Sequence, residues 1–135
     1  MHGTIDHIMI NVNEYERSAE FYSWLMPMIG YEIRMADSTR RTAGFTGKGS
    51  NVWIREAVTE FKGDRFDKRR VGLAEMAFAA ESKEQVDSVF DGLEAHGGKS
   101  EAPPHPTTYD PNNYVVFFFD PDGIKLELLY RHSIK

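Results

Sequence analysis

The sequence predicts an α+β domain built from two successive βαβββ halves. In each half, a segment with strand-like alternation precedes a helical stripe that ends at glycine, and shorter strand-like segments follow. The same offset of 68 residues also relates three pairs of landmarks in the two halves, namely His7 and Glu75, Tyr22 and Phe90, and Gly30 and Gly98. At 135 residues, the chain can bury one sizeable core and is too short for two independent domains.

The first half, about residues 1–57, opens with an alternating segment. Apolar and polar residues alternate from Ile5 to Val12, which predicts a strand with one apolar face. Apolar residues then recur at helical spacing from Tyr15 to about Ile29, with Pro27 expected to kink the last turn or end the helix early. Three short strands are predicted to follow, at residues 31–35, 43–46 and 51–56.

Residues 58–71 carry mixed charge with little apolar periodicity, which predicts an exposed linker. Its basic run is expected to be a solvated loop, with a phosphate contact as the less common alternative. The second half, about residues 72–135, repeats the pattern. Its predicted elements are a strand at 73–80, a helix at 83–95, and strands at 114–119 and 124–130 joined by an Asp-Gly turn.

Composition excludes several classes of function. The formal net charge of −5 argues against a nucleic-acid partner. No stretch approaches the roughly 20 apolar residues that a membrane-spanning helix needs, and the N-terminus lacks a basic region followed by an apolar one. We therefore expect no membrane association and a cytoplasmic location. The absence of cysteine excludes disulfides, thiolate metal sites and cysteine nucleophiles.

Three segments resemble a known superfamily. They are IDHI at residues 5–8, RSAEFY at residues 17–22, and DPDGIKLE at residues 120–127. Together they resemble the vicinal-oxygen-chelate superfamily of glyoxalases, bleomycin-resistance proteins and extradiol dioxygenases, over nearly the whole chain. The resemblance implies one domain in which both halves form a rolled, mostly antiparallel sheet around a concave site. It leaves the reaction open, because one fold hosts many functions.

The resemblance implies a small-molecule substrate or ligand. The favoured function is a divalent-metal-dependent lyase, isomerase or transferase, in which the ion polarises paired substrate oxygens and stabilises an oxyanion. The alternative is a metal-free protein that binds or sequesters a small molecule, of the bleomycin-resistance type. The resemblance also implies a homodimer. Because members often exchange modules between subunits, the site would lie within one chain or across the dimer.

The resemblance also implies a metal-binding triad of His7, Glu75 and Glu127. Glu75 departs from the pattern, which usually has histidine there, and two carboxylates should favour harder ions. The candidate ions are Mn²⁺, Fe²⁺, Ni²⁺, Zn²⁺ and Mg²⁺. The alternative is a metal-free site in which Glu75 pairs with Arg55.

Further residues are candidates for contacts with the substrate. Trp53 and Arg55 share strand parity, so Trp53 could be a stacking wall and Arg55 could bind an anionic group. The alternative for Trp53 is core packing, and the alternative for Arg55 is an ion pair. The consecutive residues 117–119 are all phenylalanine and occupy both faces of a strand, which favours core packing or a dimer contact. The other candidates are Asn11 and Tyr114 for substrate binding, and His105 and Tyr109 for proton transfer or closure of the pocket.

Overall fold

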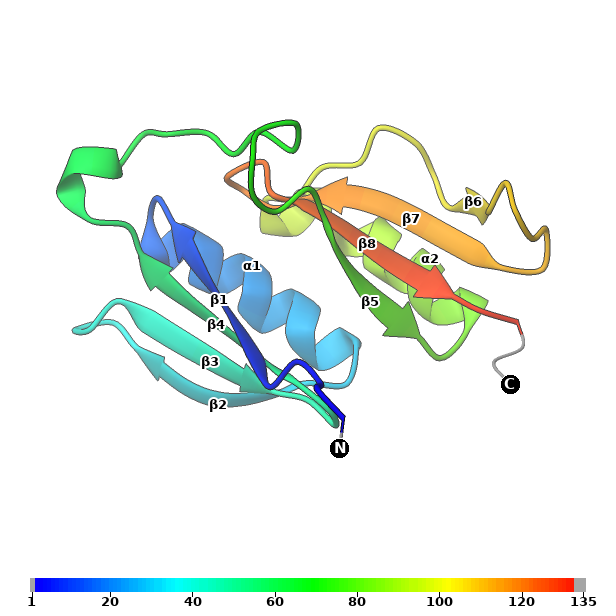
Figure 1. Cartoon of the computed structure of the whole chain (residues 1–135), viewed down its shortest axis with the longest axis horizontal. Coiled ribbons are helices and arrows are strands. Elements are labelled where there is room, and N and C mark those ends of the chain that lie inside the picture. Colours follow the sequence, from blue (N-terminus) through cyan, green and yellow to red (C-terminus); the bar gives the residue numbers. More distant parts are fainter. Residues whose placement is uncertain (1, 133–135) are drawn as a thin grey trace. The chain divides into compact units, whose positions relative to one another are not determined.

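The structure of the chain is a computed structural model that describes residues 2–132. It divides into two compact units between Asp64 and Arg65, inside the predicted linker. We call the unit that ends at Asp64 module 1 and the unit that begins at Arg65 module 2. Figure 1 shows that each module contains its own sheet and its own long helix.

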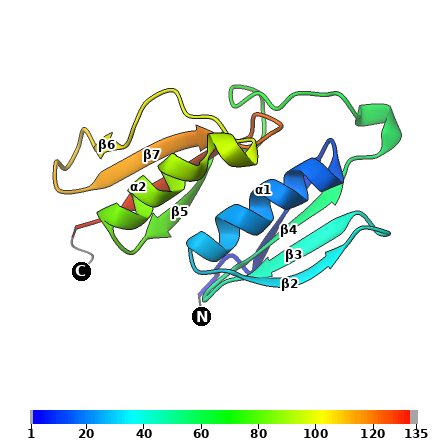
Figure 2. The same cartoon turned by 180° about the vertical axis from the view of Figure 1, so that it is seen from behind.

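Module 1 has the predicted βαβββ order. Its elements are β1 (His7–Val12), α1 (Tyr15–Met28), β2 (Glu32–Asp37), β3 (Thr42–Thr46), β4 (Asn51–Glu56) and the short 3-10 helix η1 (Thr59–Phe61). The strands form one sheet in the order β1-β4-β3-β2. β1 is parallel to β4, and the other two pairings are antiparallel. As Figure 2 shows, α1 covers one face of this sheet.

Module 2 repeats this topology. Its elements are β5 (Met76–Ala80), α2 (Lys83–Gly92), the 3-10 helix η2 (Glu94–His96), β6 (His105–Pro106), β7 (Tyr114–Phe119) and β8 (Lys125–Tyr130). The strand order is β5-β8-β7-β6, with β5 parallel to β8 and the remaining pairings antiparallel. The prediction of two βαβββ modules with mostly antiparallel sheets is therefore confirmed.

The strand registers of the two modules correspond. In module 1, Met9 pairs with Trp53, and in module 2, Ala77 pairs with Glu127. Ala77 lies 68 residues after Met9 (77 − 9), which is the offset found in the sequence. Glu75 therefore occupies the position in module 2 that His7 occupies in module 1.

Each module has its own apolar core, formed where the helix packs on the sheet. The largest fully buried core side chains of module 1 include Phe21, Tyr22, Leu25, Phe45 and Ile54, and those of module 2 include Leu93, Phe118, Leu126 and Leu128. Alternation along each strand sends the buried strand residues to the helix side and leaves the opposite side for polar and partly exposed residues. No helix within residues 2–132 is long and apolar enough to cross a membrane.

The structure differs from the predicted elements at four main points. The strand predicted at 73–80 begins only at Met76, so Glu75 lies just before β5. α1 continues through Pro27 to Met28, because a proline in the last turn removes only one helical hydrogen bond. α2 ends at Gly92 and is followed by η2, after which Gly97 adopts a φ of 90°. The two-residue strand β6 was not predicted, since its proline gives no strand signal and is tolerated only at a sheet edge.

Candidate functional site

The sheet face of module 2 that lies opposite the α2 core carries charged and aromatic side chains. Across this face, Glu127 on β8 lies between Ala77 on β5 and Phe117 on β7. In the adjacent row, Lys125 pairs with Phe119. Strand alternation thus brings carboxyl, ammonium and aromatic groups to one surface.

Two glutamates share a hydrogen bond on this face. The Glu127 side chain is only 9% exposed and is hydrogen-bonded to Glu75. Burial, together with the neighbouring Glu75 carboxylate, raises the pKa of Glu127 to about 7. The Lys125 ammonium lies 3.1 Å from Glu75 Oε1 and holds the pKa of Glu75 below its ordinary value. At neutral pH, Glu75 is therefore ionised, whereas Glu127 keeps its proton in about half of the molecules.

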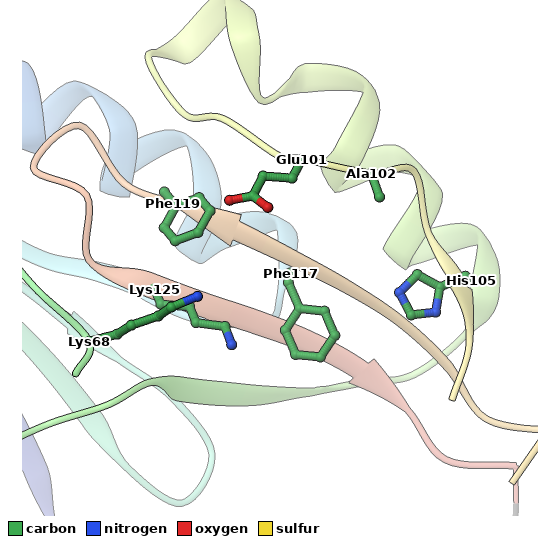
Figure 3. Close-up of a pocket in the computed structure, with 7 residues that line it drawn as sticks. All are labelled: Lys68, Glu101, Ala102, His105, Phe117, Phe119 and Lys125. Atoms are coloured by element: carbon green, nitrogen blue, oxygen red, sulfur yellow. The ribbon is translucent and has the colours of Figure 1, made fainter. Parts of the chain in front are cut away.

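Beside these glutamates lies a pocket of about 210 Å³. The Lys125 ammonium lies 4.8 Å from the centre of the Phe117 ring, and the Lys68 ammonium lies 5.9 Å from that of Phe119. Figure 3 shows both lysine side chains on the sheet face beside the phenylalanine rings. The pocket is lined by Lys68, Glu101, Ala102, His105, Phe117, Phe119 and Lys125.

His105 on β6 lies at one end of this pocket (Figure 3). Its Nδ1 atom is 2.8 Å from the carbonyl oxygen of Pro106. Because a carbonyl can only accept, this contact places a hydrogen on Nδ1 and leaves Nε2 as an acceptor in the neutral ring. The structure thus places His105 beside the pocket. Its role in proton transfer stays a prediction.

The two predicted tyrosines lie elsewhere in module 2. Tyr109 is 65% exposed, and its hydroxyl accepts a hydrogen bond from Arg131 at 3.4 Å. Tyr114 has the strand parity of the buried Phe118, and its hydroxyl donates to Asp87 on α2 at 2.8 Å. Neither residue lines the pocket of Figure 3, and their roles in catalysis and binding stay predictions.

The open face of the module 1 sheet contains the other predicted site residues. His7 Nδ1 lies 2.7 Å from Asp6 Oδ2, which leaves Nε2 free to bind a ligand or a metal ion. Arg55 Nε donates to Asn11 Oδ1 at 3.0 Å, so both side chains lie on the same face. Trp53 pairs with Met9, in the row between the Asn11–Arg55 pair and the pair that His7 forms with Asn51.

The Trp53 ring lies directly on the backbone of Gly44. A Cβ atom at Gly44 would stand 2.5 Å from the nearest ring atom, well inside van der Waals contact. Glycine at this position of β3 therefore lets the indole lie flat against the neighbouring strand. This packing fixes one face of the ring, as a stacking wall requires.

Substituting Gly44 with alanine tests this packing. The added methyl group has to displace the Trp53 ring, so we expect the free energy of unfolding to fall by about 2 kcal/mol. In a Trp24→Phe background, the emission of Trp53 should also shift. Gly49→Ala is the matched control, because no atom lies within 4 Å of its Cβ position. Equal stabilities of the two alanine variants would contradict the packing.

The residues of module 2 do not fit a bound divalent ion in this arrangement. Glu75 and Glu127 lie together, as a pair of ligands must, but Lys125 already neutralises Glu75. A divalent ion would also have to displace the proton of Glu127 and would be repelled by the ammonium group. Within either module, residues 2–132 contain no group of three His, Asp or Glu side chains placed to hold a metal ion.

Some residues of this site were missed or misassigned from the sequence. Phe117 and Phe119 line the pocket, whereas we expected the phenylalanine run to serve core packing or a dimer contact; only Phe118 is fully buried. Lys125 was also missed, although it lies two residues before Glu127 and so shares its strand face. Lys68 lies in the linker, where the lack of apolar periodicity gave no indication that its side chain reaches the pocket.

The fold defines a class of proteins with two βαβββ modules, each of which has one sheet face that its helix does not cover. The profile of the Glyoxalase/Bleomycin resistance protein/Dioxygenase superfamily matches residues 4–128. The chain belongs to this superfamily. This confirms the resemblance that residues 5–8, 17–22 and 120–127 indicated.

Individual relatives match along almost their whole length. The YqjT protein of Bacillus subtilis is 33% identical over 126 residues, covering 91% of this chain and 95% of YqjT. A Synechocystis protein named "Probable lactoylglutathione lyase" is 28% identical, covering 96% of each chain. A solved structure from Bacillus halodurans, grouped with the glyoxalases, is 32% identical with a TM-score of 0.82 and 96% coverage of both chains.

Proposed function

We propose that this protein binds a small amphipathic organic anion in the pocket of module 2 without a metal ion. The observation that carries this proposal is the pairing of two lysine ammonium groups with two phenylalanine rings in one pocket. Ammonium groups attract a carboxylate or phosphate, whereas the rings accept the flat apolar body of the ligand. Function is thus argued from the site, since the superfamily alone leaves it open.

Lys68 supplies the cation that is available to a ligand. Its ammonium forms no salt bridge with another residue of the described range 2–132, and its cation–π contact with Phe119 leaves hydrogen-bond donors free. Lys125 is already paired with Glu75. An anionic ligand would therefore be held mainly by Lys68, with Lys125 adding a second, weaker attraction.

The metal-dependent lyase, isomerase or transferase is the rival function. The adjacent carboxyl groups of Glu75 and Glu127 favour it, and His7 would be the third ligand. Metal binding would require that Lys125 leave Glu75 and that Glu127 lose its proton. Titration of Mn²⁺, Fe²⁺ and Zn²⁺ into the wild type and Glu75→Ala separates the two functions. Tight metal binding that Glu75→Ala abolishes would support the metal-dependent enzyme and overturn the proposed metal-free function.

Binding of 2-naphthoate in the presence of EDTA tests the proposed function. By calorimetry, we expect saturable binding that Phe117→Ala weakens about fivefold, because an aromatic contact surface is lost. Phe61→Ala is the matched control, since Phe61 is 56% exposed and belongs to module 1. No binding by the folded wild type, or equal affinities of the two variants, would reject this pocket as the ligand site.

The remaining expectations about partners belong to the same proposal. A protein that sequesters a small molecule would act on cytoplasmic compounds, and the superfamily implies a homodimer. In a dimer, Trp53, Arg55 and Asn11 of module 1 would contribute an aromatic wall and a further cation to ligand binding. Sedimentation equilibrium measures whether the dimer forms.

A further inference from the structure

A second hollow, formed mainly by the linker before β5, adjoins the pocket of module 2. This hollow has a volume of about 450 Å³. Both hollows are lined by Lys68, Glu101 and Phe119, which therefore form their common border. Arg65 and Arg70 line only the second.

The backbone of the linker is held in a defined turn. Asp67 Oδ1 accepts a hydrogen bond from the Arg69 amide at 2.8 Å, and the Asp67 carbonyl accepts one from the Arg70 amide at 3.1 Å. Arg65 Nη2 lies 3.7 Å from the position that a Cβ atom would take at Gly123, so the Arg65 guanidinium lies beside the turn that precedes β8. Two guanidinium groups are therefore attached to an ordered segment beside the ligand pocket.

The charges of this second hollow favour an anion. Three cations, Arg65, Lys68 and Arg70, line it together with the carboxylates of Asp67 and Glu101. Asp67 is partly satisfied by the backbone of its own turn. Guanidinium groups bind the oxygens of phosphate through paired hydrogen bonds, and a dianion gains more than a monoanion from several cations.

We infer that the second hollow binds a phosphate group of the same ligand, so that the ligand is a phosphate ester of a flat apolar acid. The acid portion would lie on Phe117 and Phe119, and the phosphate would lie between Arg65 and Arg70. This inference rests on the proposed function. Lys68 and Phe119, both labelled in Figure 3, line both hollows.

Calorimetry with two related compounds tests the inference. We expect 6-phosphonooxy-2-naphthoate to bind about tenfold more tightly than 2-naphthoate at low salt, because charge-assisted hydrogen bonds are added. Arg65→Gln and Arg70→Gln should each remove about fivefold of the affinity for the phosphorylated compound and leave 2-naphthoate unchanged. Arg69→Gln is the matched control, since Arg69 carries the same charge in the same linker and does not line the hollow.

The outcomes separate the inference from the function on which it rests. Equal affinities for the two compounds, or equal losses in Arg70→Gln and Arg69→Gln, would overturn the phosphate site while 2-naphthoate binding stands. If 2-naphthoate fails to bind but inorganic phosphate shifts the amide resonances of residues 65–70 in wild type and not in Arg70→Gln, the phosphate site holds and the aromatic pocket fails. If neither compound nor inorganic phosphate binds the folded protein, both are overturned.

Discussion

Lys125→Met is expected to raise the affinity of the protein for Mn²⁺ about tenfold or more, because it removes a positive charge next to Glu75. The methionine keeps the length and the apolar stem that lies against Phe117. Without the ammonium, the Glu75 and Glu127 carboxyls can offer oxygens to one hard cation. The wild type should bind divalent ions weakly in the same conditions.

Isothermal titration of Mn²⁺ and Zn²⁺ into metal-stripped protein at neutral pH measures this change. Lys99→Met is the matched control, because Lys99 is an exposed lysine of the same module outside the pocket. The double variant Lys125→Met with Glu75→Ala should lose the gained affinity. Equal Mn²⁺ affinities of wild type and Lys125→Met would show that Lys125 does not exclude the ion.

The architecture could be predicted from the sequence because periodicity determines it. The alternation from Ile5 to Val12 fixes which side chains of β1 face the α1 core, and the common offset of 68 residues places β5 in the second half where β1 lies in the first. The same offset places Glu75 at the position of His7. Each of these relations depends only on strand and helix geometry.

The composition of the site could be predicted only in part. The sequence offered a metal ion or Arg55 as the partner of Glu75, whereas the structure pairs Glu75 with Lys125; alternation fixes the sheet face of Lys125 but not the direction of its ammonium group. Lys68 reaches the pocket from a linker without periodicity. Tyr114 faces α2, although the loop beside it was expected to close the pocket. Such contacts depend on side-chain rotamers and loop paths, which local patterns do not encode.

Glu127→Gln is expected to stabilise the protein at alkaline pH and to leave it almost unchanged near pH 4. Burial and the neighbouring Glu75 raise the pKa of Glu127 to about 7 in the folded protein, from an ordinary value of 4.5 for a solvated glutamate. Between these two values, the folded state keeps a proton that the unfolded state has lost. The free energy of unfolding of the wild type therefore falls as pH rises through this window, by up to about 3 kcal/mol.

Glutamine has no proton to lose, so it removes this fall while its amide can still hydrogen-bond to Glu75. Urea unfolding should show Glu127→Gln more stable than wild type by about 1–3 kcal/mol at pH 8, with a difference below about 0.5 kcal/mol at pH 4. Glu75 shifts in the opposite direction, and its contribution is lost only as pH falls below its ordinary range. Glu101→Gln, at an exposed glutamate of the same module, is the control and should follow the wild type at both pH values. Parallel stability curves for wild type and Glu127→Gln from pH 5 to pH 8 would show that Glu127 holds no proton near neutral pH, and would remove the main objection to a metal ion between the two glutamates.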